Sequence, residues 1–326
     1  DSGYRSTLSV QSSLVMHPIF AFGDAEQKRK YLPGLASGEI VGCFGLTEPD
    51  AGSDPGSMKT RAERIQGGYL LSGSKMWISN AKWAELFLVM AKVDGEKFSA
   101  FLVERNFPGV SVSREEHKMG LKGSSTARLI LENAEVPVEN LLHQEGLGHH
   151  VAFNALNIGR FKLAAMSIGP ARDAIGLAAK YALERRQFGT TLSNFGLVQK
   201  KFAQMAAWFY FAESMIYRTG SLIDDAFHQW GGTVDGNRKA AEEFAIECSA
   251  CKVFATEAES PLRHGDTAPR RSNEVQRQPL PHARCAQQVG AARQIVMGQV
   301  ELHRRRTQRH QRRVEGAAGT RDGTKC

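Results

Sequence analysis

Apolar positions near the start of the chain recur with the period of an α-helix. The pattern covers residues 9–35, and we expect breaks at Pro18 and Gly23, because proline lacks a backbone amide and glycine favours non-helical conformations. Asp24 has the side chain of a helix N-cap, and Gln27 follows in the first turn of the next helix. The chain therefore begins with helical sequence.

The pattern changes to that of β-strands at residue 40. Up to about residue 139, short apolar runs such as 86–91 and 98–103 are separated by turn residues such as Gly67-Gly68. This spacing is typical of an antiparallel sheet or barrel. We expect a β domain of about 100 residues here.

Helical sequence returns near Gly148. Val198, Phe202, Met205 and Phe209 recur as one stripe of a long amphipathic helix. The order of helices, β domain and long helices excludes a doubly wound nucleotide-binding fold, because helices and strands do not alternate and no Gly-rich dinucleotide motif opens a helix.

The net charge of +8 is concentrated at the end of the chain. Residues 261–326 hold thirteen Arg and one Lys against five acidic residues, so the first 260 residues carry a formal charge of −1. The same segment contains no Phe, Tyr or Trp and can bury little apolar surface. We expect residues 260–326 to be a basic tail of different origin, and the near-neutral remainder gives no reason to expect nucleic acid as its partner. No apolar run reaches the roughly 20 residues of a membrane-spanning helix.

The five cysteines form an odd, scattered set without a secretory signal sequence before them, which favours a reducing compartment. Cys248 and Cys251 have CxxC spacing, but they lie in a helical pattern without a second pair or a histidine at zinc-ligand distance. We expect two buried helical thiols and no metal site.

Two segments have the composition of a binding site. In Phe44-Gly-Leu-Thr-Glu-Pro-Asp-Ala-Gly-Ser53-Asp54, glycines permit close backbone approach, and Thr47 and Ser53 present hydroxyls to a polar planar ring or an anion. In Lys75-Met-Trp-Ile-Ser-Asn80, Trp77 could stack on a ring while Ser79 donates to it. Taken alone, each segment is more often explained by an ordinary structural role, a polar turn for the first and a core aromatic residue for the second.

Together with Tyr181-Ala-Leu-Glu-Arg185-Arg-Gln-Phe188-Gly189, these segments resemble the acyl-CoA dehydrogenase family, and the resemblance covers residues 1–259. It implies an α+β multidomain fold with a partial N-terminal helical domain (1–39), a central antiparallel β barrel (40–140) and an incomplete C-terminal helical bundle (146–259). It also implies a homotetramer in the bacterial cytoplasm or the mitochondrial matrix, and we expect the chain, which starts at Asp1, to begin inside a larger domain.

The family binds FAD, removes the α and β hydrogens of an acyl-CoA, and passes electrons to an electron-transfer flavoprotein. By resemblance, the Thr47 hydroxyl bonds the pyrimidine end of the flavin, the Ser79 hydroxyl lies near N5, and Arg185 reaches the pyrophosphate of a neighbouring subunit's FAD. The implied cofactor-binding residues are Phe44, Leu46, Thr47, Ser53, Trp77, Ile78, Ser79, Arg185 and Phe188.

The substrate-binding residues implied by resemblance are Arg5, Ser6, Ser9, Ser53, Phe153, Asn157 and Arg160. The first segment is similar to glutaryl-CoA dehydrogenase, in which the residues matching Arg5 and Ser9 hold the distal carboxylate. From about residue 81 onward the sequence is closer to long-chain and very-long-chain enzymes. We favour glutaryl-CoA, because Arg5 would be costly to bury against an alkyl chain, with long-chain acyl-CoA next.

The catalytic base of the family is missing from the sequence. Neither the Glu-Gly-Thr motif nor the preceding Gly-Gly loop is present, and the alternative position on the bundle helix holds Gly159. Glu301 and Glu315 lack the flanking motif, so we expect impaired catalysis. A reading-frame shift near codon 260 would explain the tail, and the other two frames of the DNA would then encode the missing motifs. The alternative is a non-catalytic flavoprotein remnant whose Arg-rich tail binds nucleic acid or acidic surfaces.

Overall fold

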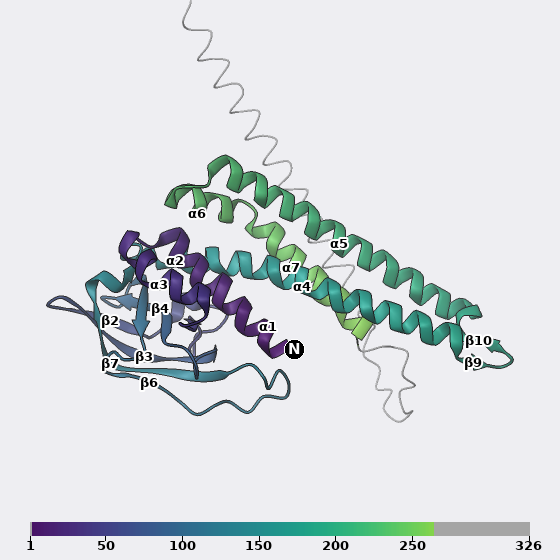
Figure 1. Cartoon of the computed structure of the whole chain (residues 1–326), viewed down its shortest axis with the longest axis horizontal. Helices are drawn as coiled ribbons and strands as arrows, with labels where there is room; N and C mark the ends of the chain where they lie inside the picture. The colour runs from purple at the N-terminus through teal and green to yellow at the C-terminus, as the bar shows by residue number, and fades with distance from the viewer. Residues whose placement is uncertain (1, 264–326) are drawn as a thin grey trace, which may run out of the picture. The chain divides into compact units, whose positions relative to one another are not determined.

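The computed structural model describes residues 2–263, which form helices, then a sheet, then long helices (Figure 1). The expected α+β class is confirmed. Residues 264–326, which hold most of the Arg-rich segment and both Glu301 and Glu315, lie outside the described residues.

The N-terminal helices are α1 (Ser2–Ser9), the π-helix η1 (Val10–Met16), α2 (His17–Phe22) and α3 (Ala25–Ser37). The expected break at Pro18 is wrong, because α1, η1 and α2 follow one another without interruption. The His17 amide bonds to the Ser12 carbonyl five residues earlier, and this wider turn changes the hydrogen-bond register just before the proline. The expected cap is confirmed: Asp24 accepts from the Gln27 amide at 2.8 Å, and the Gln27 side chain accepts from the Asp24 amide at 3.2 Å.

The central sheet has eight strands in the order β6-β7-β3-β2-β4-β5-β8, and β1 pairs with β4. Their bounds are β1 Gly42–Gly45, β2 Arg61–Ile65, β3 Gly68–Ser79, β4 Leu86–Val93, β5 Lys97–Glu104, β6 Val110–Val112, β7 Thr126–Pro137 and β8 Leu141–Leu142. The pairings are antiparallel, as expected, except that β4 runs parallel to both β1 and β2. Short 3-10 turns at Pro55–Ser57 and Val138–Asn140 complete this region.

Strand β4 explains why the run 86–91 lacks polar alternation. Phe87 and Val89 point into a core on one face of the sheet, whereas Leu86 and Leu88 point into a second core on the other face. The N-terminal helices and the first turns of the long helix that follows the sheet cover the second core. The strand is therefore buried on both faces.

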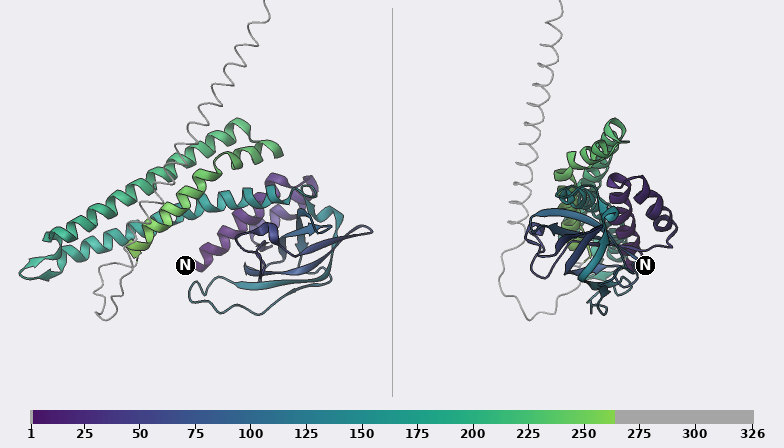
Figure 2. Two further views of the ribbon diagram at one scale, coloured as in Figure 1. Left: turned by 180° about the vertical axis from the view of Figure 1, so that it is seen from behind. Right: turned by 90° about the vertical axis from the view of Figure 1, so that its left-hand side faces the viewer.

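The C-terminal part consists of two long helices, a small hairpin and two shorter helices (Figure 2). They are α4 (Gly148–Glu184), the hairpin β9 (Arg186–Gln187) and β10 (Thr190–Thr191), a 3-10 turn (Leu192–Asn194), α5 (Gly196–Trp230), α6 (Val234–Glu243) and α7 (Ala245–Arg263). The expected stripe of Val198, Phe202, Met205 and Phe209 lies on α5, and all four residues are half-buried among the described residues.

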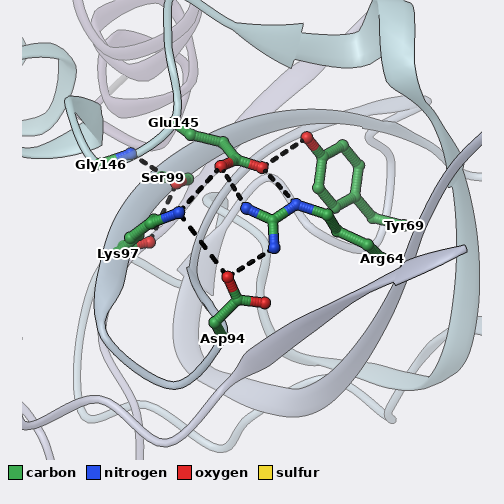
Figure 3. Close-up of polar contacts among 7 residues, drawn as sticks. All are labelled: Arg64, Tyr69, Asp94, Lys97, Ser99, Glu145 and Gly146. Carbon is green, nitrogen blue, oxygen red and sulfur yellow. Dashed lines mark hydrogen bonds and ion pairs between the residues drawn. The ribbon is translucent and has the colours of Figure 1, made fainter.

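An ionic network fixes the segment before α4 to the sheet (Figure 3). Arg64 donates to both oxygens of Glu145 at 3.1 and 2.6 Å and to Asp94 at 2.5 Å, and the Tyr69 hydroxyl donates to Glu145 at 2.9 Å. The hydrogen bonds from Arg64 lower the pKa of Glu145. Arg64 and Asp94 are exposed and Glu145 is half-buried, so the network orients the chain more than it stabilises it.

Cys248 and Cys251 are buried free thiols on α7, as the sequence predicted. Burial raises the pKa of Cys248 to about 12, which makes it a poor nucleophile and ligand at neutral pH. Within residues 2–263, no group of three or more potential ligands could hold a metal ion. No helix in this part of the chain is long and apolar enough to cross a membrane.

Candidate functional site

The two segments with binding-site composition lie against each other. The Met76 amide donates to the Thr47 carbonyl at 2.8 Å, and Lys75 Nζ donates to the Leu46 carbonyl at 3.3 Å. Strand β1 ends at Gly45, and the loop that follows it meets the end of β3. Residues almost 30 positions apart in the sequence therefore form one surface.

A bulge near the end of β3 turns one side chain outward. The pairing of β3 with β7 shifts register between Lys75 and Ile78. Trp77 lies in this bulge with a φ of 59° and is 58% exposed, whereas Ile78 is buried. A tryptophan rarely adopts this conformation, and such strain is concentrated at functional sites. The bulge therefore leaves the indole ring exposed at this surface.

Hydroxyl donors flank the indole in the sequence and across the loop. Thr47 and Ser79 are both half-buried, and Ser53 is exposed in the loop after β1. Among the described residues, no hydrogen bond involves the side-chain hydroxyl of Thr47 or Ser79. Both hydroxyls can therefore bond to a ligand. Phe44 is half-buried and Leu46 is buried next to them.

A buried ion pair lies behind the loop. Lys75 Nζ and Glu48 Oε1 are 2.7 Å apart, and the two side chains are 0% and 4% exposed. Burial lowers the pKa of Lys75 to about 8, although Glu48 opposes this shift. Burial alone would raise the pKa of Glu48, but the charge and hydrogen bond of Lys75, together with the hydrogen bonds from Thr60 and Lys59, lower that pKa. Neither residue has a role predicted from the sequence, although a lysine in an otherwise half-buried strand is an unusual residue that points to a buried partner.

Asn80, directly after Ser79, joins three parts of the fold. It is fully buried with a φ of 68°, and its Nδ2 donates to the Gly42 carbonyl of β1 at 3.2 Å and to the Thr7 carbonyl of α1 at 3.3 Å. The Gly42 amide in turn donates to Gln11 Oε1 of η1 at 2.7 Å. The roles of Asn80 and Gln11 could not be predicted from the sequence, because their hydrogen-bond partners are distant in the sequence.

The expected substrate residues lie on α1 and α4, and the π-helix η1 that follows α1 contacts α4. Arg5 is exposed and Ser6 and Ser9 are half-buried on α1, while Phe153, Asn157 and Arg160 lie on α4. Arg160 Nη1 donates to Asn157 Oδ1 at 2.8 Å. Lys162 of α4 donates to Ser12 of η1 at 3.0 Å, which shows that the two helical segments are neighbours.

Arg185 and Phe188 lie far from the loop site within one chain. They follow α4, whose 37 residues make it about 55 Å long. Both are exposed, and Phe188 is 87% exposed with a φ of 51° at the tip of the β9–β10 hairpin. The structure brings neither residue to the Thr47 and Ser79 hydroxyls of the same chain.

Models of three domains of one family match consecutive segments of the chain. The acyl-CoA dehydrogenase N-terminal domain matches residues 1–39, the middle domain residues 43–134 and the C-terminal domain residues 146–260. This chain belongs to the acyl-CoA dehydrogenase family.

Similar proteins carry the same family name. A probable acyl-CoA dehydrogenase of Bacillus subtilis is 53% identical over 246 residues, which are 74% of this chain and 41% of that protein. The very long-chain specific mitochondrial acyl-CoA dehydrogenase of Homo sapiens is 41% identical over 269 residues, 79% of this chain and 39% of that protein. The chain thus spans about two fifths of the length of these curated relatives.

Solved acyl-CoA dehydrogenases share the fold. The enzyme from Bacillus anthracis, complexed with FAD, is 45% identical with a TM-score of 0.75 over 80% of this chain and 46% of that chain. A glutaryl-CoA dehydrogenase from Mycobacterium smegmatis, in complex with FADH2, is 36% identical with a TM-score of 0.65 over 81% of this chain and 69% of that chain.

The residues at the ends of β1 and β3 fit a flavin. An isoalloxazine ring needs hydrogen-bond donors at its polar edges and an aromatic or apolar surface beside it. The hydroxyls of Thr47 and Ser79 and the exposed indole of Trp77 supply these features on one surface. The chemistry of the donor set therefore agrees with the cofactor of the solved relatives.

Proposed function

We propose that this chain binds FAD and is part of an enzyme that removes the α and β hydrogens of an acyl-CoA thioester. The hydrogen bond from the Met76 amide to the Thr47 carbonyl carries the proposal, because it joins the two segments that bear the hydroxyl donors. Thr47 would donate to the pyrimidine end of the flavin and Ser79 near N5. Phe44, Leu46, Trp77 and Ile78 would line the ring, and Ser53 would meet the substrate's CoA portion.

Bound FAD supplies the acceptor for the hydride from Cβ. The protein's contribution is to place hydroxyl donors where negative charge develops, because such hydrogen bonds strengthen as the charge grows. Ser79 lies on the same strand as the buried Ile78, so its position is fixed by the sheet. The proton from Cα needs a carboxylate, and none can be assigned within residues 2–263.

For the substrate, we propose glutaryl-CoA. An exposed guanidinium at Arg5 can bond a distal carboxylate bidentately, and Ser6 and Ser9 follow on the same helix. On α4, Phe153, Asn157 and Arg160 would contact the pantetheine and CoA portions. Long-chain acyl-CoA is the second candidate, favoured by the 41% identity to the very long-chain specific enzyme.

Purification and a visible spectrum test the cofactor, and assays of glutaryl-CoA against palmitoyl-CoA with an artificial electron acceptor test the substrate. We expect a bound flavin spectrum and low turnover. Arg5→Met should reduce turnover of glutaryl-CoA and leave that of palmitoyl-CoA unchanged. Colourless protein that does not take up added FAD would contradict the proposal.

A matched pair of variants tests the missing base. A Cβ at Gly159 would lie 3.6 Å from Leu14 Cδ2, an ordinary contact, so Gly159→Glu can be accommodated on α4. We expect this change to raise turnover by roughly 100-fold, within the range of general-base catalysis. Gly169→Glu on the same helix, where no atom lies within 4 Å of an added Cβ, is the control. Strong turnover by the wild type would show that a base exists elsewhere.

The partners are proposals as well. Arg185 and Phe188, exposed on the hairpin, would reach the FAD of a neighbouring subunit in a homotetramer, and an electron-transfer flavoprotein would accept the electrons. We place the enzyme in the bacterial cytoplasm or the mitochondrial matrix. Sedimentation of the full chain with FAD tests the oligomer, and a monomer that binds FAD fully would exclude the role of the hairpin.

A further inference from the structure

The buried Lys75–Glu48 pair needs an explanation beyond stability. Both side chains are removed from water, at 0% and 4% exposure. The free energy needed to remove two charges from water is often as large as the free energy gained from their attraction. A protein with an apolar pair of similar volume in their place is therefore often equally stable or more stable. A buried pair is therefore informative through its contacts, which here are with the backbone.

These contacts hold consecutive residues of the loop after β1. Lys75 Nζ donates to the Leu46 carbonyl at 3.3 Å and to Glu48 Oε1 at 2.7 Å. The Met76 amide donates to the Thr47 carbonyl at 2.8 Å. Two adjacent residues of β3 thus hold residues 46, 47 and 48 one after another. The backbone of Thr47 is fixed from both sides, although its hydroxyl remains available.

The acidic partner is fixed in turn to the next part of the loop. Glu48 Oε2 accepts from the Lys59 amide at 2.6 Å, and Oε1 accepts from the Thr60 amide at 3.1 Å. The carboxylate therefore joins the two ends of the segment 48–60, which includes Ser53. An apolar side chain at position 48 could accept none of these hydrogen bonds.

A second lysine pair in the same segment provides a contrast. Lys59 Nζ and Asp50 Oδ2 are also 2.7 Å apart, but the side chains are 74% and 68% exposed. The Lys59 ammonium has no hydrogen bond to residues 46–48 among the described contacts. Removing it changes a surface charge and leaves the backbone bonds of the loop in place.

We propose that Lys75 and Glu48 form a positioning pair, which holds the loop of residues 46–48 in the conformation that binds FAD. The inference rests on the proposed flavin site, and the pair contacts the loop through the Leu46 carbonyl and the Lys59 and Thr60 amides. It acts by fixing the backbone from which the Thr47 hydroxyl extends.

The test is the double variant Lys75→Met/Glu48→Leu in the full chain, which replaces the ions with apolar side chains. We expect it to fold, with an unfolding midpoint near that of the wild type, but to bind FAD at least about tenfold more weakly in a fluorescence titration. Its flavin spectrum should shift towards that of free FAD. Amide hydrogen exchange of the flavin-free chain should become faster at Lys59, Thr60 and Met76. Lys59→Met should match the wild type in all of these measurements.

Two results would overturn the proposal. One is a double variant that binds FAD within about twofold of the wild type. The other is unchanged exchange of the Lys59, Thr60 and Met76 amides in the flavin-free double variant. This result would show that the pair does not fix the loop, and it can be obtained even if the wild type binds no FAD and the proposed function itself fails. If the double variant does not fold, Glu48→Gln replaces it, because glutamine keeps the side-chain shape and removes the charge. FAD affinity and amide exchange are then measured on this variant.

Discussion

Large apolar side chains are buried in the sheet, but several are exposed on the long helices α4 and α5. In the sheet, Phe87 and Phe101 are 0% exposed. On α4 and α5, Leu177, Leu197 and Tyr217 are between 71% and 79% exposed among the described residues. The sheet, which carries the candidate flavin loop, thus has a closed core of its own, whereas the helices present a surface typical of contact with further protein.

The largest difference is expected when a side chain is removed from each region. Phe101→Ala leaves a cavity in the sheet core and should lower the free energy of unfolding by about 3–5 kcal/mol. Leu197→Ala removes an exposed side chain and should change it by less than about 0.5 kcal/mol in a monomer. Urea unfolding of both variants checks this, and equal losses would remove the contrast between the regions.

The next effect concerns the junction of the sheet with α1. In Asn80→Asp, a carboxylate would face the carbonyls of Thr7 and Gly42, which now accept hydrogen bonds from the amide. We expect a loss of roughly 2–3 kcal/mol, because two acceptors and a charge would be buried without donors. Asn80→Gly is the matched variant, since glycine adopts the φ of 68° freely, and it should lose less. If both variants unfold at the same urea concentration, these hydrogen bonds do not control the junction.

Acid should weaken the sheet through Glu48. Burial alone would raise its pKa, but the charge and hydrogen bond of Lys75, with the hydrogen bonds from Thr60 and Lys59, make that pKa lower in the folded state. The stabilisation is therefore complete above the unfolded-state pKa of a glutamate and is lost as the pH falls through the folded pKa. Urea midpoints between pH 7 and pH 3 should fall more steeply for the wild type than for Lys75→Met/Glu48→Leu. Parallel curves would mean that the pair is not linked to folding.

The smallest effect is expected at the tip of the hairpin between the long helices. Phe188 has a φ of 51°, which is strained for an aromatic residue, and Phe188→Asn would create the Asn-Gly turn preferred in two-residue hairpins. We expect the variant to be more stable by about 1 kcal/mol and to retain less FAD after gel filtration. Lower stability of the variant, or full FAD retention, would contradict the prediction that Phe188 adopts a strained conformation in order to contact the FAD of a neighbouring subunit.

Local sequence patterns predicted the elements better than their connections. The cap at Asp24 and the strand over 86–91 depend on neighbouring residues, and both are present. Pro18 did not break the helix, because the π-turn before it alters a hydrogen-bond register that spacing does not reveal. The domain boundaries and the roles of Thr47, Ser79, Arg5 and Arg185 stay predictions.

The sequence by itself determined the α+β order, the apolar run that forms β4, and the two segments that resemble a flavin site. The tertiary structure decided which distant groups support those segments: Lys75 against Glu48, 27 residues away, and Asn80 against Gly42 and Thr7, 38 and 73 residues away. Periodicity records which face of an element is buried, but only the pairing of strands and the packing of helices specify what lies opposite. The pattern of β3 therefore marks Lys75 as an unusual residue on a buried face, but only the structure identifies Glu48 as its partner.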